Sequence, residues 1–197
     1  MPADAPLYPV FLRLTGRRVV VVGGGSVAAS KLPALLAVGA RVTVVAPEIR
    51  PEIAAADVTR VQRAFEPADL DQAFYVIAAS PPDVNRQVSA AAEERHLFVN
   101  AVDDAASASA FLGGVVRREG VTIAISTEGT APALAGLLRE AIEAVLPSDL
   151  VDWITTARTL RTRWKSGKIP MTARRPELLA ALNALYEGRH SAAGEKQ

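Results

Sequence analysis

The sequence predicts an α/β fold with a parallel sheet, and three observations support this prediction. A run of four valines ends at a glycine triplet, Val19–Gly25. An apolar helical pattern begins at once after the glycines, and β-branched segments then alternate with helical segments over the first hundred residues. A continuous β-branched run is typical of a strand buried on both faces, and its junction with glycines and a helix is the entry of a βαβ unit. We therefore predict a Rossmann-type doubly wound parallel sheet, followed by a small α+β dimerisation segment and a helical C-terminal domain.

The glycine turn has the spacing of the dinucleotide-binding fingerprint in its G-x-G-x-x-A form, Gly23-x-Gly25-x-x-Ala28. Gly23 would allow the tight turn, Gly25 would let a pyrophosphate approach the backbone, and Ala28 would let the helix lie close to the strand. The pyrophosphate would then sit on the free N–H groups at the helix start. A turn without a ligand is the alternative, but the ordered strand, turn, helix and second strand favour a nucleotide site. Lys31, in the same helix, is interpreted as a solvated residue rather than a contact to a ligand anion.

The other elements follow from hydrophobic spacing and turn residues. Helices are predicted at residues 26–38, 47–55, 83–96, 133–146, 148–165 and 176–186, and strands at 41–46, 59–64, 73–79, 97–100, 115–118 and 121–126. Gly39 is expected as the C′ residue of the first helix, and Pro33 is expected to kink that helix. The pattern changes after Phe111. We predict an NAD-binding domain at 1–112, a dimerisation segment at 113–147 and a helical domain at 148–197.

Composition narrows the function classes. The 197 residues carry 22 basic and 21 acidic side chains, so no general attraction to nucleic acid or to a membrane surface is expected. Half of the residues are apolar, but no stretch approaches the roughly 20 residues that span a bilayer, and no signal peptide is recognisable. The absence of cysteine excludes disulfides, thiolate metal ligands and a cysteine nucleophile. We expect a cytoplasmic protein whose partner is a small molecule or another protein.

Two loops at the expected carboxyl edge of the sheet are candidates for contacts with a cofactor, because ligands of doubly wound sheets lie at this edge. Ala79 and Ser80 follow a buried strand there, with a proline-stiffened turn as the alternative. NAD-dependent dehydrogenases usually carry an acid at the tip of the second strand, whereas this chain has Ala46 and Pro47, with Glu48 after them. Glu48 either reaches the ribose or is a first-turn acid of the helix expected at 47–55.

An acidic pair, Asp103 and Asp104, follows the strand at 97–100. A carboxylate at the carboxyl edge of the sheet can serve as a general base. Adjacent side chains point in different directions, so we expect one in the cleft and one outside it. An Asx turn or a helix N-cap explains the pair equally well. His96, at the end of the preceding helix, is interpreted as a charge that stabilises the helix end.

Several segments together resemble the siroheme synthase N-terminal family: Val21–Ala28 with Lys31, Val42–Pro47, Ala78–Ser80, Asn100–Asp103 and Ile125–Leu134. This family comprises precorrin-2 dehydrogenases, some of which are also sirohydrochlorin ferrochelatases. The resemblance implies a Rossmann domain, a central dimerisation domain and a helical C-terminal domain, assembled as a homodimer that uses NAD.

The resemblance also assigns roles to residues. Ser26 and Val27 match positions that bind NAD, Pro47 and Glu48 match adenosine-ribose positions, and Asp103 matches the aspartate implicated in dehydrogenation and, in bifunctional members, in chelation. With the fingerprint, the expected cofactor-binding residues are Gly23, Gly25, Ser26, Val27, Ala28, Pro47, Glu48, Ala79 and Ser80. Asp103 is the expected catalytic residue.

The implied substrate, precorrin-2, is a polycarboxylate. Arg158 and Arg161, on the basic helix at 148–165, could hold its acetate and propionate groups by forked hydrogen bonds, or they form a solvated face at a dimer contact. Thr127 matches a hydroxyl position near the tetrapyrrole. The expected substrate-binding residues are Asn100, Ser126, Thr127, Arg158 and Arg161.

The implied reaction moves a hydride from precorrin-2 to the nicotinamide and a proton to a base. Ferrous iron would be a further substrate if the chain also acted as a chelatase. Only two histidines are present, His96 and His190, and neither lies in a ligand cluster, so we expect no preformed metal site. Two other functions fit parts of the pattern: a non-catalytic NAD-sensing regulatory domain and an NAD-dependent dehydrogenase of another substrate.

Overall fold

The computed structural model describes residues 6–194, with side chains described as far as Tyr186. The chain forms two compact units. The first comprises Met1–Gly113 and Ser126–Pro132, and the second comprises Gly114–Ile125 and Ala133–Gln197. The division into three domains at residues 112 and 147 stays a prediction. Within the described residues, no helix is both long enough and apolar enough to cross a bilayer.

The first unit is built on a parallel sheet of five strands in the order β3-β2-β1-β4-β5. The strands are β1 (Arg18–Val22), β2 (Arg41–Val45), β3 (Thr59–Val61), β4 (Tyr75–Ala78) and β5 (Phe98–Ala101). The central strand β1 pairs with both β2 and β4, so that Val20 lies between Thr43 and Val76. The four valines of β1 are at most 1% exposed, as expected for a strand that is covered on both faces.

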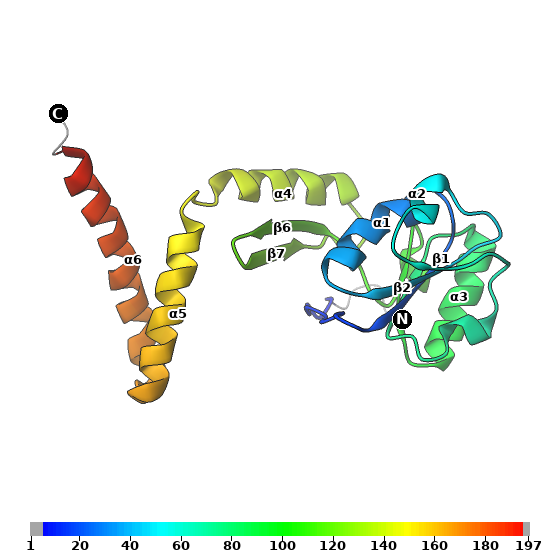
Figure 1. The fold of residues 1–197 in the computed structure, drawn as a ribbon, viewed down its shortest axis with the longest axis horizontal. Coiled ribbons are helices and arrows are strands. Elements are labelled where there is room, and N and C mark those ends of the chain that lie inside the picture. The colour runs from blue at the N-terminus through cyan, green and yellow to red at the C-terminus, as the bar shows by residue number, and fades with distance from the viewer. Residues whose placement is uncertain (1–5, 195–197) are drawn as a thin grey trace. The chain divides into compact units, whose positions relative to one another are not determined.

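Helices cover both faces of this sheet (Figure 1). The helices of this unit are α1 (Ser26–Ala37), α2 (Pro51–Ala54) and α3 (Pro82–Glu94), with the short 3-10 helices η1 (Pro67–Leu70) and η2 (Ala105–Ser107). One core cluster joins Leu32 of α1 and Ile53 of α2 to one face of the sheet, and a second joins Val88 of α3 to the other face. The doubly wound Rossmann-type fold is therefore confirmed.

The helix predicted at residues 47–55 is wrong in its start, because α2 begins at Pro51. A residue that precedes proline avoids the helical conformation, and Arg50 is accordingly extended, with φ −64° and ψ 153°. The Arg50 N–H donates to the carbonyl of Gly24 at 3.0 Å instead. Pro33 lies inside α1, which is continuous over its length, and Gly39 follows it with the predicted left-handed φ of 73°.

The second unit contains a hairpin and three helices. The hairpin strands are β6 (Gly114–Arg118) and β7 (Val121–Ile125), and the helices are α4 (Pro132–Val145), α5 (Leu150–Ser166) and α6 (Met171–Gly194). Glu119 and Gly120 both have positive φ, which a two-residue hairpin turn requires. The guanidinium of Arg118 donates to the carbonyl of Leu146 at 2.9 Å and so joins the hairpin to the end of α4.

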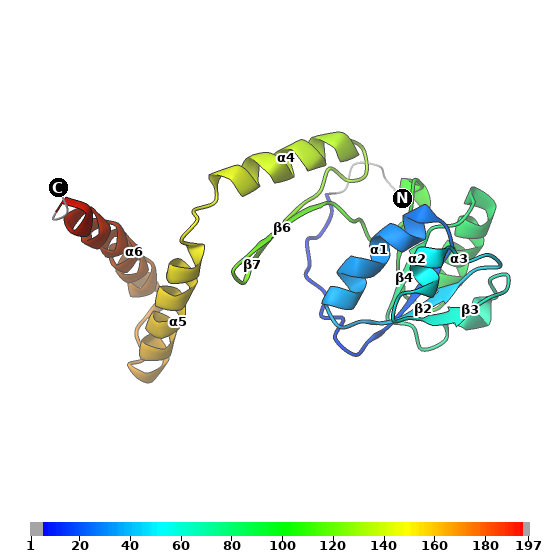
Figure 2. The ribbon, with the colours of Figure 1, turned by 45° about the horizontal axis from the view of Figure 1, so that its top comes forward.

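The helices α5 and α6 lie side by side and run in opposite directions (Figures 1 and 2). Trp164 of α5 is buried, and its indole N–H donates to the carboxylate of Glu177 on α6. Trp153 and Tyr186 make an edge-to-face contact further along the pair, with ring centroids 6.2 Å apart. The helix predicted to start at Pro176 begins earlier, at Met171, so that Pro176 lies inside α6.

Candidate functional site

The carboxyl edge of the parallel sheet carries most of the residues predicted to bind the cofactor. The strand order reverses at β1, so the loops after β1 and β4 diverge and open a crevice between them. The glycine turn follows β1, and Ala79 and Ser80 follow β4. The Ser80 hydroxyl donates to the carbonyl of Val22 at 3.0 Å, and the Ser80 N–H donates to Oδ1 of Asn85 at 2.9 Å. The two loops are therefore tied to each other.

Two glycines of the turn are required by the packing of the protein on itself. Gly23 has φ +132°, and a Cβ there would lie 2.2 Å from the carbonyl oxygen of Ala79. A Cβ at Gly24 would lie 1.8 Å from the carbonyl oxygen of Glu48. Sequence reasoning assigned no role to Gly24, although a third glycine that the fingerprint does not require was a signal of such a contact.

Gly25 is different, because a Cβ at this position would meet no atom within 4 Å. Gly25 is the N-cap of α1, no side chain caps this helix, and its first turn contains no acid. The backbone N–H groups of Ser26 and Val27 are thus available at an exposed helix start, where the helix dipole favours an anion. Ala28 is fully buried against the sheet, which fits the close packing that the fingerprint requires.

A cavity of about 480 Å³ lies beside this turn. Its walls are the glycine turn, the loop from Ala46 to Glu48, the segment at Ala64 and Phe65, and the loop that begins at Ala79. Because α2 begins only at Pro51, Glu48 is not a first-turn acid of that helix. Glu48 is exposed and lines the cavity beside Pro47, where its carboxylate can accept hydrogen bonds from ribose hydroxyls.

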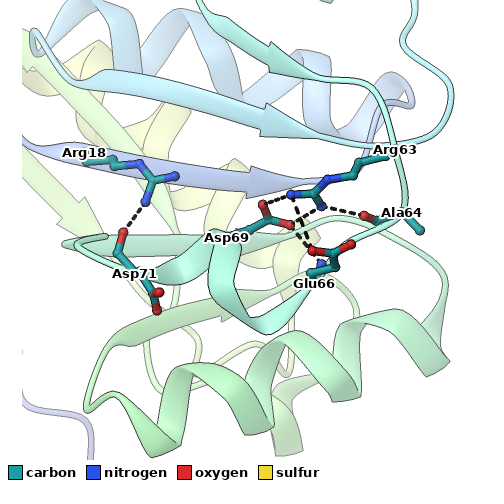
Figure 3. A network of polar contacts seen from close by, with 6 residues as sticks. All are labelled: Arg18, Arg63, Ala64, Glu66, Asp69 and Asp71. Carbon is teal, nitrogen blue, oxygen red and sulfur yellow. Dashed lines mark hydrogen bonds and ion pairs between the residues drawn. The ribbon is translucent and has the colours of Figure 1, made fainter.

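The wall at Ala64 and Phe65 is held by a network of charged groups that sequence reasoning missed (Figure 3). The guanidinium of Arg63 donates to both carboxylate oxygens of Asp69, at 2.6 and 2.8 Å, and to the carbonyl of Ala64 at 2.8 Å. The Glu66 N–H also donates to the Asp69 carboxylate at 2.8 Å. A two-point contact of this kind holds the loop in one conformation beside the cavity.

Asp69 is the only acid among the buried residues of the described chain, with its side chain 8% exposed. Burial acts to raise the pKa of this carboxyl, but the Arg63 guanidinium and the Glu66 N–H outweigh it, so the pKa lies below its usual value. Asp69 therefore remains ionised in the folded protein at neutral pH.

Two further cavities of the first unit meet at Asp103. The smaller, about 250 Å³, is lined by Val27, Ala79 and Ser80, which also border the glycine turn, and by Asp103. The larger, about 440 Å³, is lined by Asp103 together with Lys31 and Phe111 and by other residues of the 100–105 and 111–132 segments. Asp103 thus lies between a cavity next to the cofactor turn and a larger cavity beyond it.

The expectation that one residue of the acidic pair lies in the cleft and the other outside it is wrong, because Asp103 and Asp104 line both cavities. The N-cap alternative holds for Asp104, whose carboxylate accepts from the Ser107 N–H at 3.2 Å at the start of η2. This hydrogen bond lowers the pKa of Asp104. Asp103 is exposed, has φ +58°, and makes no hydrogen bond or ion pair with other described residues.

Lys31, interpreted from the sequence as a solvated residue, lines the larger cavity with Asp103 and is half-buried, so the alternative of a contact with a ligand anion stays open. Only the tertiary structure reveals this position, because the cavity forms from segments that are far apart in the sequence.

The three hydroxyl and amide residues expected on the substrate side make contacts within the protein. The Asn100 side chain is 8% exposed, lines the larger cavity, and donates to the carbonyl of Ala110 at 3.0 Å. The Ser126 hydroxyl accepts from the Glu128 N–H at 3.0 Å, and the Thr127 hydroxyl accepts from the Ala131 N–H at 3.3 Å. Ser126 and Thr127 therefore shape the loop that supplies Gly129 and Pro132 to the cavity.

Arg158 and Arg161 lie on α5 in the second unit, and both are exposed. The Arg158 guanidinium lies against the hairpin turn, since a Cβ at Gly120 would come within 3.3 Å of it. A role of these arginines in substrate binding stays a prediction. His96, with φ +54°, follows the end of α3, and within the described residues no group of three or more histidine or acidic side chains could hold a metal ion.

A parallel sheet of this order, with a glycine turn and a cavity at the point where the order reverses, defines a dinucleotide-binding domain of the Rossmann class. Comparison with protein families agrees with this class. Residues 10–114 match the family described as "Putative NAD(P)-binding", and residues 118–144 match the family "Sirohaem biosynthesis protein central". The chain belongs to the family described as "Putative NAD(P)-binding", and the match of residues 118–144 agrees with the predicted resemblance to the siroheme synthase N-terminal family.

Curated relatives include the siroheme synthase of Baumannia cicadellinicola, which is 42% identical over 162 residues, or 80% of this chain and 35% of the relative. The siroheme synthase of Photorhabdus laumondii is 40% identical over 183 residues, or 90% of this chain and 39% of the relative. The chain thus spans well under half the length of these relatives. The solved structure of SirC, a precorrin-2 dehydrogenase, has the same fold, with a TM-score of 0.65, 23% identity and 88% of each chain covered.

Substitution of Asp69 by Asn tests the network that holds the cavity wall. We expect Asp69→Asn to lower the free energy of unfolding at pH 7 by about 2 kcal/mol, because it removes charge-assisted hydrogen bonds at a buried site. The pKa of Asp69 is lowered in the folded state, so the wild-type advantage is present above the ordinary carboxyl pKa and is lost as the pH falls through the folded value. Urea unfolding at several pH values measures this difference.

Asp71→Asn is the matched control for this experiment. The Asp71 side chain is 63% exposed and pairs with Arg95 at 3.0 Å, so its loss should change the free energy of unfolding by less than about 1 kcal/mol. An equal loss of unfolding free energy in the two variants would contradict the conclusion that the buried Asp69 network stabilises the cavity wall.

Two alanine substitutions in the glycine turn separate packing from ligand binding. We expect Gly24→Ala to lower the free energy of unfolding by about 2 kcal/mol, because its Cβ overlaps the Glu48 carbonyl. Gly25→Ala should cost less than about 1 kcal/mol. It should nevertheless weaken NAD binding about tenfold, since the new Cβ occupies the approach of the pyrophosphate. Thermal unfolding and titration with NAD measure the two effects, and undiminished NAD binding by Gly25→Ala would contradict this location of the pyrophosphate.

Proposed function

We propose that the chain is an NAD-dependent precorrin-2 dehydrogenase that oxidises precorrin-2 to sirohydrochlorin. The observation that carries this proposal is the position of Asp103 between two cavities. One cavity shares Ala79 and Ser80 with the cavity of the glycine turn, and the other is large and lies beyond Asp103. This arrangement gives a cofactor and a substrate separate spaces on the two sides of one carboxylate. The siroheme synthase relatives and the precorrin-2 dehydrogenase SirC support the assignment of substrate.

The residues of the glycine turn would hold the cofactor. The backbone N–H groups of Ser26 and Val27 would bind the pyrophosphate, with Gly25 allowing its approach. Glu48 and Pro47 would bind the adenosine ribose at the far wall of the same cavity. NAD supplies a hydride acceptor when bound, and an acid at the ribose favours NAD over NADP.

Asp103 would accept the proton that the substrate loses. Oxidation of precorrin-2 to sirohydrochlorin transfers one hydride to NAD and releases one proton, so the products are sirohydrochlorin, NADH and a proton. The Asp103 carboxylate has no partner among the described residues and lines both cavities, which makes it available for that proton. Asp104 is less suitable, because its carboxylate caps η2.

The polycarboxylate substrate would occupy the larger cavity, beside Asn100 and the loop that contains Ser126 and Thr127. Phe111 and Leu112 offer an apolar surface to the flat macrocycle. Independently of this cavity, the guanidinium groups of Arg158 and Arg161 on α5 of the second unit are proposed to bind acetate and propionate side chains of the substrate.

The proposal includes a homodimer and a cytoplasmic location. Helix α4 exposes much of the surface of four apolar side chains, Leu134, Leu137, Leu138 and Val145. An exposed apolar helix face of this kind is typical of a subunit contact. The cytoplasmic location follows from the proposed use of NAD, which is an intracellular cofactor.

The proposal predicts loss of turnover when Asp103 loses its charge. In an anaerobic assay with precorrin-2 and NAD, we expect Asp103→Asn to lower kcat by about 100-fold or more, because proton transfer to a positioned base contributes at least this factor. Asp57→Asn removes an exposed carboxylate from the same unit and serves as the control with wild-type kcat. The absorbance of the tetrapyrrole reports the reaction. Addition of ferrous iron to the wild-type reaction then shows whether siroheme forms, which decides between a dehydrogenase alone and a bifunctional enzyme.

The same assay distinguishes the alternative functions. A regulatory NAD-sensing domain would bind NAD and leave precorrin-2 unchanged, and a dehydrogenase of another substrate would do the same in the presence of precorrin-2. Either outcome for the wild-type protein would contradict the proposed function.

The arginines of α5 are tested by substitution one at a time. We expect Arg158→Ala and Arg161→Ala to raise the KM for precorrin-2 by about tenfold each, because each removes a charged hydrogen-bond donor from a carboxylate of the substrate. Sedimentation analysis checks that the oligomeric state is unchanged. Unaltered KM values in both variants would identify this surface as a solvated helix face.

A further inference from the structure

Lys31 stands out among the cations of the first unit because it lines the cavity that Asp103 also lines. It belongs to the second turn of α1, is half-buried, and shares the walls of the 440 Å³ cavity with Asp103. Among the described residues that line this cavity, Lys31 is the only lysine or arginine. The 480 Å³ cavity beside the glycine turn has no lysine or arginine in its walls.

The ammonium group of Lys31 makes no hydrogen bond or ion pair with other described residues. Three arginines of the same unit are paired with carboxylates: Arg63 with Asp69, Arg95 with Asp71, and Arg50 with Glu52. The half-buried Lys31 residue thus carries an ammonium that no carboxylate of the described residues neutralises. Such a group is suited to an anion that arrives with a ligand.

The other charges of the cavity suggest how this anion would be arranged. Asp104 is held by the Ser107 N–H at the start of η2, so its carboxylate is already engaged. Asp103 lines the same cavity, is exposed, and makes no hydrogen bond or ion pair with other described residues. Lys31 and Asp103 thus present opposite charges to one space, with Phe111 and Leu112 as its apolar part. A flat ligand with acidic side chains matches this distribution, since the acid meets Lys31 and the ring meets the apolar wall.

We propose that Lys31 binds a carboxylate side chain of the tetrapyrrole and thereby positions the ring edge that reacts next to Asp103. This inference rests on the proposed function and adds a specificity-determining residue to it. Lys31 is a positioning residue here, because the hydride and the proton are transferred elsewhere. A point-charge contact of this kind weakens with salt, as lysine-to-carboxylate contacts do.

The test compares Lys31→Gln with Lys31→Arg and with Arg13→Gln, which removes an exposed positive charge of the same unit outside this cavity. Steady-state kinetics gives KM for precorrin-2 and for NAD separately, and fluorescence titration gives the Kd of the product sirohydrochlorin. We expect Lys31→Gln to raise KM for precorrin-2 and Kd for sirohydrochlorin by about tenfold, with KM for NAD and the unfolding temperature unchanged. Lys31→Arg should recover most of the affinity, and Arg13→Gln should behave as wild type. Added salt should weaken binding by the wild type more than by Lys31→Gln.

The possible results separate this inference from the proposed function. Wild-type turnover with an unchanged KM for precorrin-2 in Lys31→Gln would overturn the role of Lys31 and leave the proposed function standing. A raised KM for NAD alone would overturn it as well, because Lys31 would then serve the cofactor. Binding of sirohydrochlorin that depends on Lys31, without turnover by the wild type, would support the anion contact and contradict the dehydrogenase. Failure of the wild type to bind sirohydrochlorin would overturn both.

Discussion

The close approach of three backbone segments at Gly23 and Gly24 is the constraint on which the site depends. The carbonyl of Ala79 packs against Gly23 and the carbonyl of Glu48 packs against Gly24, with no space for a side chain at either position. These contacts bring the loops after β2 and β4 onto the turn after β1. The next residue, Gly25, is left facing open space at an uncapped helix start. One turn therefore assembles the edge of the sheet and exposes the N–H groups that an anion needs.

Other segments of the first unit form the remaining walls of the cavities around this turn. The Arg63–Asp69 network holds the segment that closes the cofactor cavity and joins a loop residue, Arg63, to the short helix η1, which contains Asp69 (Figure 3). On the other side, Asp103 adopts a left-handed conformation directly after β5 and lies between the smaller and the larger cavity. Aspartate tolerates this conformation better than most residues other than glycine, because its short side chain can hydrogen-bond locally.

Much of the fold was predictable because strong local signals coincide with it. The valine run, the glycine spacing and the alternation of strands and helices all depend on residues that are neighbours in the sequence. The start of α2 was predicted wrongly, although Arg50 precedes a proline and a residue before proline avoids the helical conformation. Gly24, Lys31 and the partners of Asp69 could not be assigned in the same way, because their roles arise from contacts between segments that only the folded chain brings together. The difference between Asp103 and Asp104 likewise depends on η2, because the Asp104 carboxylate accepts a hydrogen bond at the start of this single short turn.

The most direct test of this account is a crystal structure of the protein with NAD and sirohydrochlorin bound. We expect the pyrophosphate on the N–H groups of Ser26 and Val27, and the nicotinamide ring in the smaller cavity beside Ser80 and Asp103. We expect the tetrapyrrole in the larger cavity, on the far side of Asp103. A nicotinamide ring bound away from Asp103, or a tetrapyrrole bound outside that cavity, would contradict the central claim that this carboxylate stands between cofactor and substrate.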